Sequence, residues 1–570
     1  MAVAFRAVDD VTDEDTSEPA PVKRQRRFPL AIWLVVALQA MLMIGMTVLY
    51  PSFQSPDEVA HVDYVIAHRQ GEWFDGSGER RFQAGVQAAY GQVPGTQFRQ
   101  HAGGVTPLPR SARKSFDTLG AGQGNLFPNQ MTQHPPLYYG LAAAFTYVVP
   151  NWIHQRFDLQ VFWLRLFSLL LLLPVPLLIY STAWRICDND SLALTAALIP
   201  LSMPLYLRTG ASVTNDSLMI LLGTVIVALL VKIAWGNLSR RTAVLLGLAW
   251  GAALLTKGFA LSVPPAIGLA YLVGATGTFG QRVRQAWPGV TIAGAVGSAI
   301  GAWWWVRNVI VYGTVQPDGF STLSDNDRQA VFGTDHLGGS DLNFPGNFFR
   351  LLGQRIWGSI GLIDQPSLDH WILFTMAIIL AALLVLSLLV THRRFATRRA
   401  LVGVRSWTLG RASTLIVPAL LMLVTMYYAS RRIYLHGRQL SVIQVRYLLP
   451  AIIGLVICVA VAVHVLAGRA ARWLPLATLT GTLVFVGASV YSVLDVEMSS
   501  NSPDRLQRLK DALHYVAGWA PFPAPVTALL LAAAGGVAVA TLVVLAVMGA
   551  HTEPVAPPPA PRVLVGSESD

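Results

Sequence analysis

The chain has 570 residues, of which 53% are hydrophobic and only 13% are charged, and its mean hydropathy is +0.49. This composition excludes a soluble globular protein, because several windows exceed the roughly 20 apolar residues that cross a bilayer. The net charge of +11 does not indicate nucleic-acid binding, since the arginines and lysines concentrate in short loops and no basic run is interleaved with aromatic residues. The two cysteines, Cys187 and Cys458, provide neither a disulfide framework nor a zinc-binding spacing.

The first segment, residues 1–28, begins acidic and ends in a basic run at residues 23–27. This pattern predicts a disordered tail whose positive flank stays in the cytoplasm. The apolar run that follows, 29–50, is long enough to remain as a membrane span and is no cleavable signal. We therefore expect the next segment, from residue 51, to lie on the outer face.

Further apolar runs predict an all-α, multi-pass membrane protein. They lie near 135–150, 162–184, 191–207, 216–234, 242–256, 258–276, 288–306, 369–391, 412–429, 447–469, 473–495 and 524–549. The run at 135–150 is short for a crossing, and treating it as a half-buried helix on the outer side places the arginine-rich loops in the cytoplasm, as the positive-inside rule requires. The expected organisation is a transmembrane domain of about 12 helices over 29–549 and a disordered, Pro-rich cytoplasmic tail over 550–570.

On this topology four pieces of chain lie on the outer face. They are a large first loop with juxtamembrane helices at 51–161, a second loop at 307–369, a basic loop at 430–446 and an amphipathic helix within 496–523. For the last, the sequence predicts Ser502 as the N-cap, Pro503 as the first helical residue and an apolar stripe of Leu506, Leu509 and Leu513.

Two adjacent carboxylates, Asp57 and Glu58, open the first outer loop. If residues 56–69 are helical, Asp57 shares a face with His61, so that acid and imidazole would point into one wet cavity. A structural interpretation stands beside this one, because Ser55 and Glu58 have the spacing of a capping box with Pro at the first helical position.

Basic side chains on the outer face indicate an anion-binding site. Arg431, Arg432, Arg438 and Arg446 fall where the orientation rule predicts few cations, and the planar fork of arginine suits phosphate. Three further charged residues lie at outer ends of spans: Lys257, Arg307 and Asp216. Headgroup contacts, snorkelling and helix capping are the structural alternatives.

A series of short motifs in one order resembles the GT-C superfamily of multi-pass glycosyltransferases, which includes protein O-mannosyltransferases and the lipid A aminoarabinose transferase. The motifs are residues 57–58 (DE), 134–139 (HPPLYY), 215–217 (NDS), 255–258 (LTKG) and 303–308 (WWWVRN). Residues 55–61 (SPDEVAH) together with 444–450 (QVRYLLP) resemble, more narrowly, a bacterial branch of unassigned function. That branch usually has Gly before the Arg-Tyr pair, where this chain has Val445.

The resemblance implies a bacterial plasma-membrane enzyme that moves a sugar from a polyprenyl-phosphate donor to an envelope glycan, lipid or protein acceptor outside the cytoplasm, with inversion. It implies Asp57 as the general base, with Glu58 beside it as a second catalytic carboxylate. The implied phosphate-binding residues are Lys257, Arg307, Arg438 and Arg446. The implied residues that line the site or bind the acceptor are His61, His134, Tyr138, Asp216 and Tyr447.

No cofactor is required by this interpretation, although Asp57 and Asp216 would suit a hard divalent cation such as Mg²⁺ or Mn²⁺. Two other functions stay open: a transporter or flippase of a lipid-linked sugar, and a non-catalytic subunit of envelope assembly. A transporter predicts ionisable residues at mid-span and broken helices near the bilayer centre, whereas the ionisable groups here gather at outer ends.

Overall fold

The computed structural model describes residues 28–74, 76–93, 106–324, 343–358, 368–404, 406–437 and 443–551. Most of these residues are helical, which confirms the predicted all-α class. A two-stranded antiparallel sheet in the first outer loop, β1 with β2, was not predicted. Arg438 and both terminal tails lie outside the described residues.

The elements follow one another along the chain in this order. They are α1 (Leu30–Leu49), α2 (Glu58–Arg69), β1 (Arg81–Gln83), α3 (Ala84–Gln92), η2 (Arg110–Ala112), α4 (Phe116–Leu119), β2 (Gln123–Pro128), η3 (Gln130–Gln133), α5 (Leu137–Val148), η4 (Trp152–His154), α6 (Phe157–Leu172), α7 (Val175–Cys187), α8 (Asp190–Leu198), η5 (Ile199–Ser202), α9 (Pro204–Gly210), α10 (Asp216–Ala234), α11 (Arg240–Leu254), η6 (Gly258–Ser262), α12 (Pro264–Gly274), α13 (Phe279–Tyr312), α15 (Phe344–Gly358), α16 (His370–Leu389), η8 (Arg393–Phe395), α17 (Ala396–Leu401), α18 (Leu409–Gly437), η9 (Val445–Ala451), α19 (Ile452–Ala467), η10 (Gly468–Trp473), α20 (Leu474–Glu497), α21 (Arg505–Trp519) and α22 (Ala524–His551).

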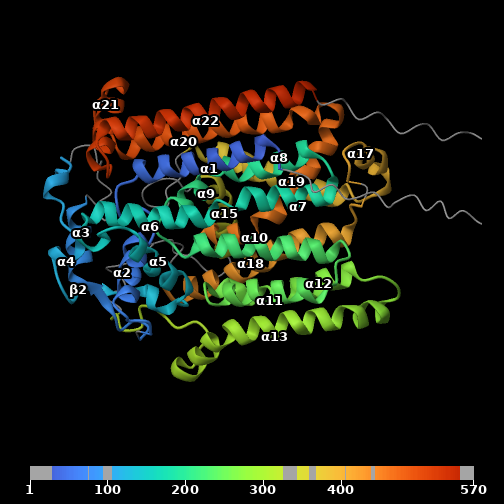
Figure 1. Cartoon of the computed structure of the whole chain (residues 1–570), viewed down its shortest axis with the longest axis horizontal. Helices are drawn as coiled ribbons and strands as arrows, with labels where there is room; N and C mark the ends of the chain where they lie inside the picture. Colours follow the sequence, from blue (N-terminus) through green and yellow to red (C-terminus); the bar gives the residue numbers. More distant parts are fainter. Residues whose placement is uncertain are drawn as a thin grey trace, which may run out of the picture.

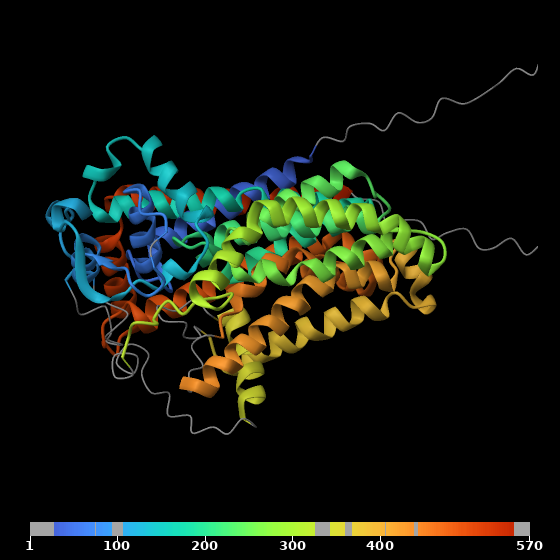
Figure 2. The ribbon, with the colours of Figure 1, turned by 90° about the horizontal axis from the view of Figure 1, so that it is seen from below.

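The long helices run side by side as a bundle, and the outer-loop elements gather at one of its ends. Figure 1 shows α2, α3, α4, β2 and α21 together at the left, whereas α17 lies at the opposite end; Figure 2 shows the same loop elements again at one end. Contacts join pieces that are far apart in sequence: Gln316 Nε2 donates to Gln133 O at 3.3 Å, and Arg110 Nη2 donates to Phe522 O at 2.7 Å. The pieces predicted to share one face therefore do lie together.

Eight helical segments of the described residues are long and apolar enough to cross a membrane, or nine if the bent pair Asp190–Ser202 and Pro204–Gly210 is one span. Two of the predicted runs form shorter helices, α11 with 15 residues and α12 with 11. The predicted count of about 12 spans is thus not confirmed. The run at 135–150 forms α5, whose 12 residues are short for a crossing, as expected.

Close packing at one glycine sets the position of the functional residues. A Cβ on Gly223 of α10 would lie 2.2 Å from the carbonyl oxygen of Pro450 in η9, so only glycine allows this approach. The contact holds η9 directly against α10. Since α10 begins at Asp216 and η9 contains Arg446, the same contact brings these two side chains together.

The amphipathic helix near the C-terminus differs in detail from the prediction. It begins at Arg505, and the cap is the Asp504 carboxylate, which accepts from the N–H of Leu506 at 3.0 Å. The face that packs inward is formed by Ala512, Tyr515, Val516 and Trp519, while Leu506 and Leu513 are exposed. The predicted stripe is therefore divided: Leu509 is half-buried against the core, whereas Leu506 and Leu513 face outward.

Candidate active site at the start of α10 and η9

Asp57 immediately precedes α2, and its side chain makes no capping hydrogen bond. Its backbone is left-handed, with φ of 59°, a conformation that is uncommon for a residue other than glycine and is more frequent for Asp and Asn than for most others. The predicted capping box is wrong, because α2 begins at Glu58 and the Ser55 hydroxyl instead accepts a hydrogen bond from Ser212 Oγ at 2.7 Å. The Asp57 carboxylate is free of a capping role.

The carboxylate of Asp57 forms an ion pair across the site. Arg446 Nη2 donates to Asp57 Oδ2 at 2.5 Å, and Gln130 Nε2 donates to Asp57 Oδ1 at 3.0 Å. The Asp57 side chain is 34% exposed, whereas that of Arg446 is 7% exposed. The ion pair therefore lies at the rim of the buried charge cluster.

Asp216 joins two cations beneath this rim. Lys257 Nζ donates to Asp216 Oδ1 at 2.5 Å, and Arg446 Nε lies 3.2 Å from Asp216 Oδ2. Lys257 Nζ also lies 4.5 Å from the ring centroid of Tyr447, a cation–π distance. Both Asp216 and Lys257 are buried, so Lys257 does not snorkel, and Asp216 makes ion pairs at the start of α10. The cluster Asp57–Arg446–Asp216–Lys257, called the charge cluster below, holds two acids and two bases.

Two histidines near the charge cluster are neutral. Burial, reinforced by the charges of Lys257 and Arg446, lowers the pKa of His61 well below its usual value. Burial also lowers the pKa of His134 to about 3, with Lys257 again contributing. His61 Nδ1 lies 3.0 Å from the hydroxyl of Tyr139. These imidazoles can therefore donate or accept hydrogen bonds without adding positive charge.

Glu58 is turned away from Asp57 into a separate buried ion pair. Its carboxylate accepts from Arg165 Nε at 2.8 Å and from Arg165 Nη2 at 2.6 Å. The N–H groups of Phe53 and Val213 donate to the same carboxylate at 2.9 Å and 3.0 Å. These four hydrogen bonds use all of the acceptor capacity of the Glu58 carboxylate and favour a structural role for it.

The other predicted residues divide into two groups. Tyr447 contacts the charge cluster, and Tyr138 supports it, because its hydroxyl accepts from the N–H of Thr214, two residues before Asp216, at 3.1 Å. The contacts of Arg307 lie apart from the charge cluster: its guanidinium carbon lies 5.2 Å from the Trp304 ring centroid, and its Nη1 donates to Asn308 at 3.3 Å.

Three residues near the site were missed by sequence analysis: Gln130, Arg165 and Arg208. Arg208 is buried and, with Arg446, lines a small cavity of about 20 Å³, the size of a water site. Arg165 and Arg208 could have been found from the sequence, since an arginine within or directly after an apolar run indicates a buried ionic role. Gln130 carries no such signal, because an amide in a Gln-rich loop is not distinctive.

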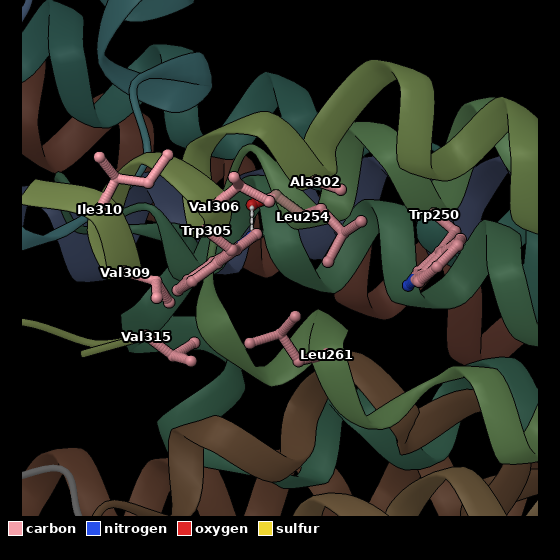
Figure 3. Close-up of a pocket in the computed structure, with 9 residues that line it drawn as sticks. All are labelled: Trp250, Leu254, Leu261, Ala302, Trp305, Val306, Val309, Ile310 and Val315. Atoms are coloured by element: carbon pink, nitrogen blue, oxygen red, sulfur yellow. Dashed lines mark hydrogen bonds between the residues drawn. The ribbon is translucent and has the colours of Figure 1, made fainter. Parts of the chain in front are cut away.

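An apolar groove of about 410 Å³ lies between α11, η6 and α13 (Figure 3). Its wall includes Leu254 and Leu261, which flank Lys257 in sequence, and Trp305, whose indole N–H donates to the Leu254 carbonyl at 3.1 Å. Val309 and Ile310 on the α13 side are exposed, so the groove opens to the surroundings of the bundle. It is lined by Trp250, Leu254, Leu261, Ala302, Trp305, Val306, Val309, Ile310 and Val315.

The proposed metal ligands do not form a metal site in this arrangement. The Arg446 guanidinium contacts both Asp57 and Asp216 and so lies where a shared cation would bind. Within the part of the chain that the structure describes, no group of three or more His, Cys, Asp or Glu side chains is placed to hold a metal ion. We therefore derive no step through a metal.

Comparison with known proteins identifies the family. Residues 40–455, well over half of the chain, match the family described as "Predicted membrane protein (DUF2142)". The chain belongs to the DUF2142 family. The matched range of this family includes every residue of the charge cluster. No curated protein matches the chain.

Among solved structures, this DUF2142 protein is similar over most of its length to ArnT and to an archaeal oligosaccharyltransferase. ArnT from Cupriavidus metallidurans, apo, matches at 13% identity and a TM-score of 0.42, over 91% of this chain and 77% of that chain. The same ArnT bound to undecaprenyl phosphate matches at 14% and 0.41, over 91% and 78%. The Archaeoglobus fulgidus oligosaccharyltransferase with Zn and sulfate matches at 13% and 0.43, over 85% and 61%.

Proposed function

We propose that this DUF2142 protein is an inverting glycosyltransferase that uses a polyprenyl-phosphate-linked sugar at the end of the bundle that carries the outer loops. The observation that carries this proposal is the charge cluster, in which the partly exposed Asp57 carboxylate pairs with Arg446 and the buried Asp216 carboxylate contacts both Arg446 and Lys257. A carboxylate within reach of an acceptor hydroxyl, beside cations that suit phosphate, is the combination that glycosyl transfer requires.

In the proposed reaction the acceptor hydroxyl oxygen attacks the anomeric carbon of the donor sugar. The bond between that carbon and the phosphate oxygen breaks, and its electron pair stays on the phosphate. The hydroxyl proton passes to the Asp57 carboxylate. Arg446 and Lys257 stabilise the charge that develops on the departing phosphate, and Asp216 keeps both cations in place.

The apolar groove would receive part of the isoprenoid chain of the donor. Its lining is apolar throughout, and the loop that carries Lys257 also supplies Leu254 and Leu261 to its wall (Figure 3). A chain placed there would leave its phosphate near the charge cluster. The acceptor, whether envelope glycan, lipid or protein, would approach the exposed side of Asp57.

Transfer is tested with the full chain in proteoliposomes. Undecaprenyl phosphates that carry radiolabelled arabinose or mannose are offered with an envelope extract, and the label that leaves the organic phase is counted. Asp57→Asn should reduce transfer at least about a hundredfold, the low end of a general-base contribution. Asp117→Asn, an exposed carboxylate of the first outer loop, is the matched control and should keep wild-type transfer. Transfer by Asp57→Asn at the wild-type rate would show that the base lies elsewhere.

One observation favours the transporter alternative. The segments Asp190–Ser202 and Pro204–Gly210 meet at a bend of 77°, and broken helices are typical of transporters. This alternative predicts that a fluorescent polyprenyl phosphate crosses the bilayer of the proteoliposomes when the protein is present. Flipping without any release of sugar would replace the transferase proposal.

A further inference from the structure

Two nitrogens on one edge of the Arg446 guanidinium face two different carboxylates. Nη2 donates to Asp57 Oδ2 at 2.5 Å, Nε lies 3.2 Å from Asp216 Oδ2, and Nη1 donates to the Pro56 carbonyl at 3.4 Å. The edge formed by Nε and Nη2 is one that binds a single carboxylate or phosphate through two parallel hydrogen bonds. A phosphate can take this edge only after one of the two carboxylates has moved.

Asp57 is the carboxylate that is free to move. Asp216 is buried and is held by Lys257 at 2.5 Å and by the Thr214 hydroxyl at 3.3 Å. Asp57 is 34% exposed, precedes a helix that it does not cap, and has left-handed backbone geometry.

The formal charges of the charge cluster also favour an exchange of Asp57 for a phosphate. Two acids and two bases leave the charge cluster neutral, which a buried site requires. If Asp57 moves out toward solvent, one positive charge is left over. A polyprenyl-phosphate-linked sugar is a phosphodiester with one negative charge, so it would restore neutrality.

We propose that the phosphodiester of the donor takes the place of the Asp57 carboxylate on Arg446, so that donor binding releases the catalytic base. This inference rests on the proposed function. Before the donor arrives, the Asp57 carboxylate is held by Arg446. After the exchange, Gln130 is the positioning residue, because its amide still holds the other carboxylate oxygen from 3.0 Å.

The exchange makes a prediction about affinity that a simple binding site does not. We would measure binding of undecaprenyl phosphate, as the probe, to the detergent-solubilised full chain at pH 7 by microscale thermophoresis. Asp57→Asn and Asp57→Gly should both bind it more tightly, by about tenfold to a hundredfold, because a charge-assisted competitor for Arg446 is lost. Both residues suit a φ of 59°, so both variants should fold. Asp117→Asn should bind as the wild type does.

Arg446→Ala separates this inference from the proposed function. Loss of binding in Arg446→Ala, together with tighter binding in both Asp57 variants, supports both the exchange and the proposed function. If Arg446→Ala loses binding but the Asp57 variants bind no more tightly than the wild type, the phosphate site stands and the exchange is refuted. If Arg446→Ala binds undecaprenyl phosphate as well as the wild type does, the phosphate site itself is misplaced and both ideas fail.

Discussion

The adjacent carboxylates Asp57 and Glu58 should differ in how much the loss of their negative charge changes the free energy of unfolding. Glu58→Gln leaves the Arg165 guanidinium buried without a counter-charge, and it turns an amide N–H₂ toward groups that donate. Breaking a buried ion pair by removing one partner costs about 3–5 kcal/mol. Asp57→Asn changes a side chain that is 34% exposed and should alter the free energy of unfolding by less than about 1 kcal/mol.

The assay is thermal unfolding of the detergent-solubilised protein, followed by tryptophan fluorescence, with size-exclusion chromatography to detect aggregation. Glu58→Gln should melt well below the wild type, and Asp57→Asn close to it. A double variant, Glu58→Gln with Arg165→Met, should recover much of the loss, because removing both charges leaves neither one buried alone.

The result that would refute this reasoning is a Glu58→Gln variant that melts like the wild type and loses sugar transfer. Glu58 would then act in the chemistry, and its buried contacts with Arg165 would not be its main role. A double variant less stable than Glu58→Gln alone would also contradict the ion-pair account.

Three other predictions follow from the structure. Lys257→Met should weaken binding of undecaprenyl phosphate, measured by thermophoresis, by about tenfold to a hundredfold. Arg307→Ala should change this binding by less than about threefold, because the contacts of Arg307 lie apart from the charge cluster. Equal losses of binding in the two variants would argue against the proposed phosphate site. Burial lowers the pKa of His134 to about 3, from about 6.5 in an unfolded chain, so the unfolded state takes up a proton first as the pH falls. The melting temperature should therefore fall as the pH drops from about 6.5 toward 3. His134→Gln should lessen that fall. A membrane-impermeant maleimide added to whole cells should label Glu79→Cys and Leu506→Cys but not Arg398→Cys, and labelling of the last would reverse the assumed topology.

The sequence was sufficient for the fold class and for the gathering of charged motifs at one end, because apolar length and the distribution of arginines are local signals of membrane crossing and orientation. It also supplied the members of the charge cluster, since Asp57, Asp216, Lys257 and Arg446 all lie at ends of apolar runs. Which of them pair depends on contacts between residues that are 41 to 389 positions apart, and no local pattern predicts these contacts.

The sequence misplaced the start of α2, and the reason is physical. A serine followed by proline and two acids favours a helix start at the proline, but the Ser55 hydroxyl is hydrogen-bonded to Ser212, and the chain turns through a left-handed Asp57 first. The same tertiary contacts separate Glu58 from Asp57 and turn it toward Arg165. The sequence thus predicted a catalytic role for both Asp57 and Glu58, whereas in the structure Asp57 pairs with Arg446 and Glu58 pairs with Arg165.

The shortness of α11 and α12 has a consequence for the membrane itself. At 1.5 Å per residue they span about 22 Å and 16 Å, less than the roughly 30 Å of a hydrocarbon core. If these helices cross the membrane, a hydrophobic mismatch of this size would draw the two leaflets together beside them. Lys257, in the turn between the two helices, would then lie below the headgroup level of the undisturbed bilayer. A phosphate in the thinned leaflet would reach the lysine by moving sideways, without being lifted out of the membrane.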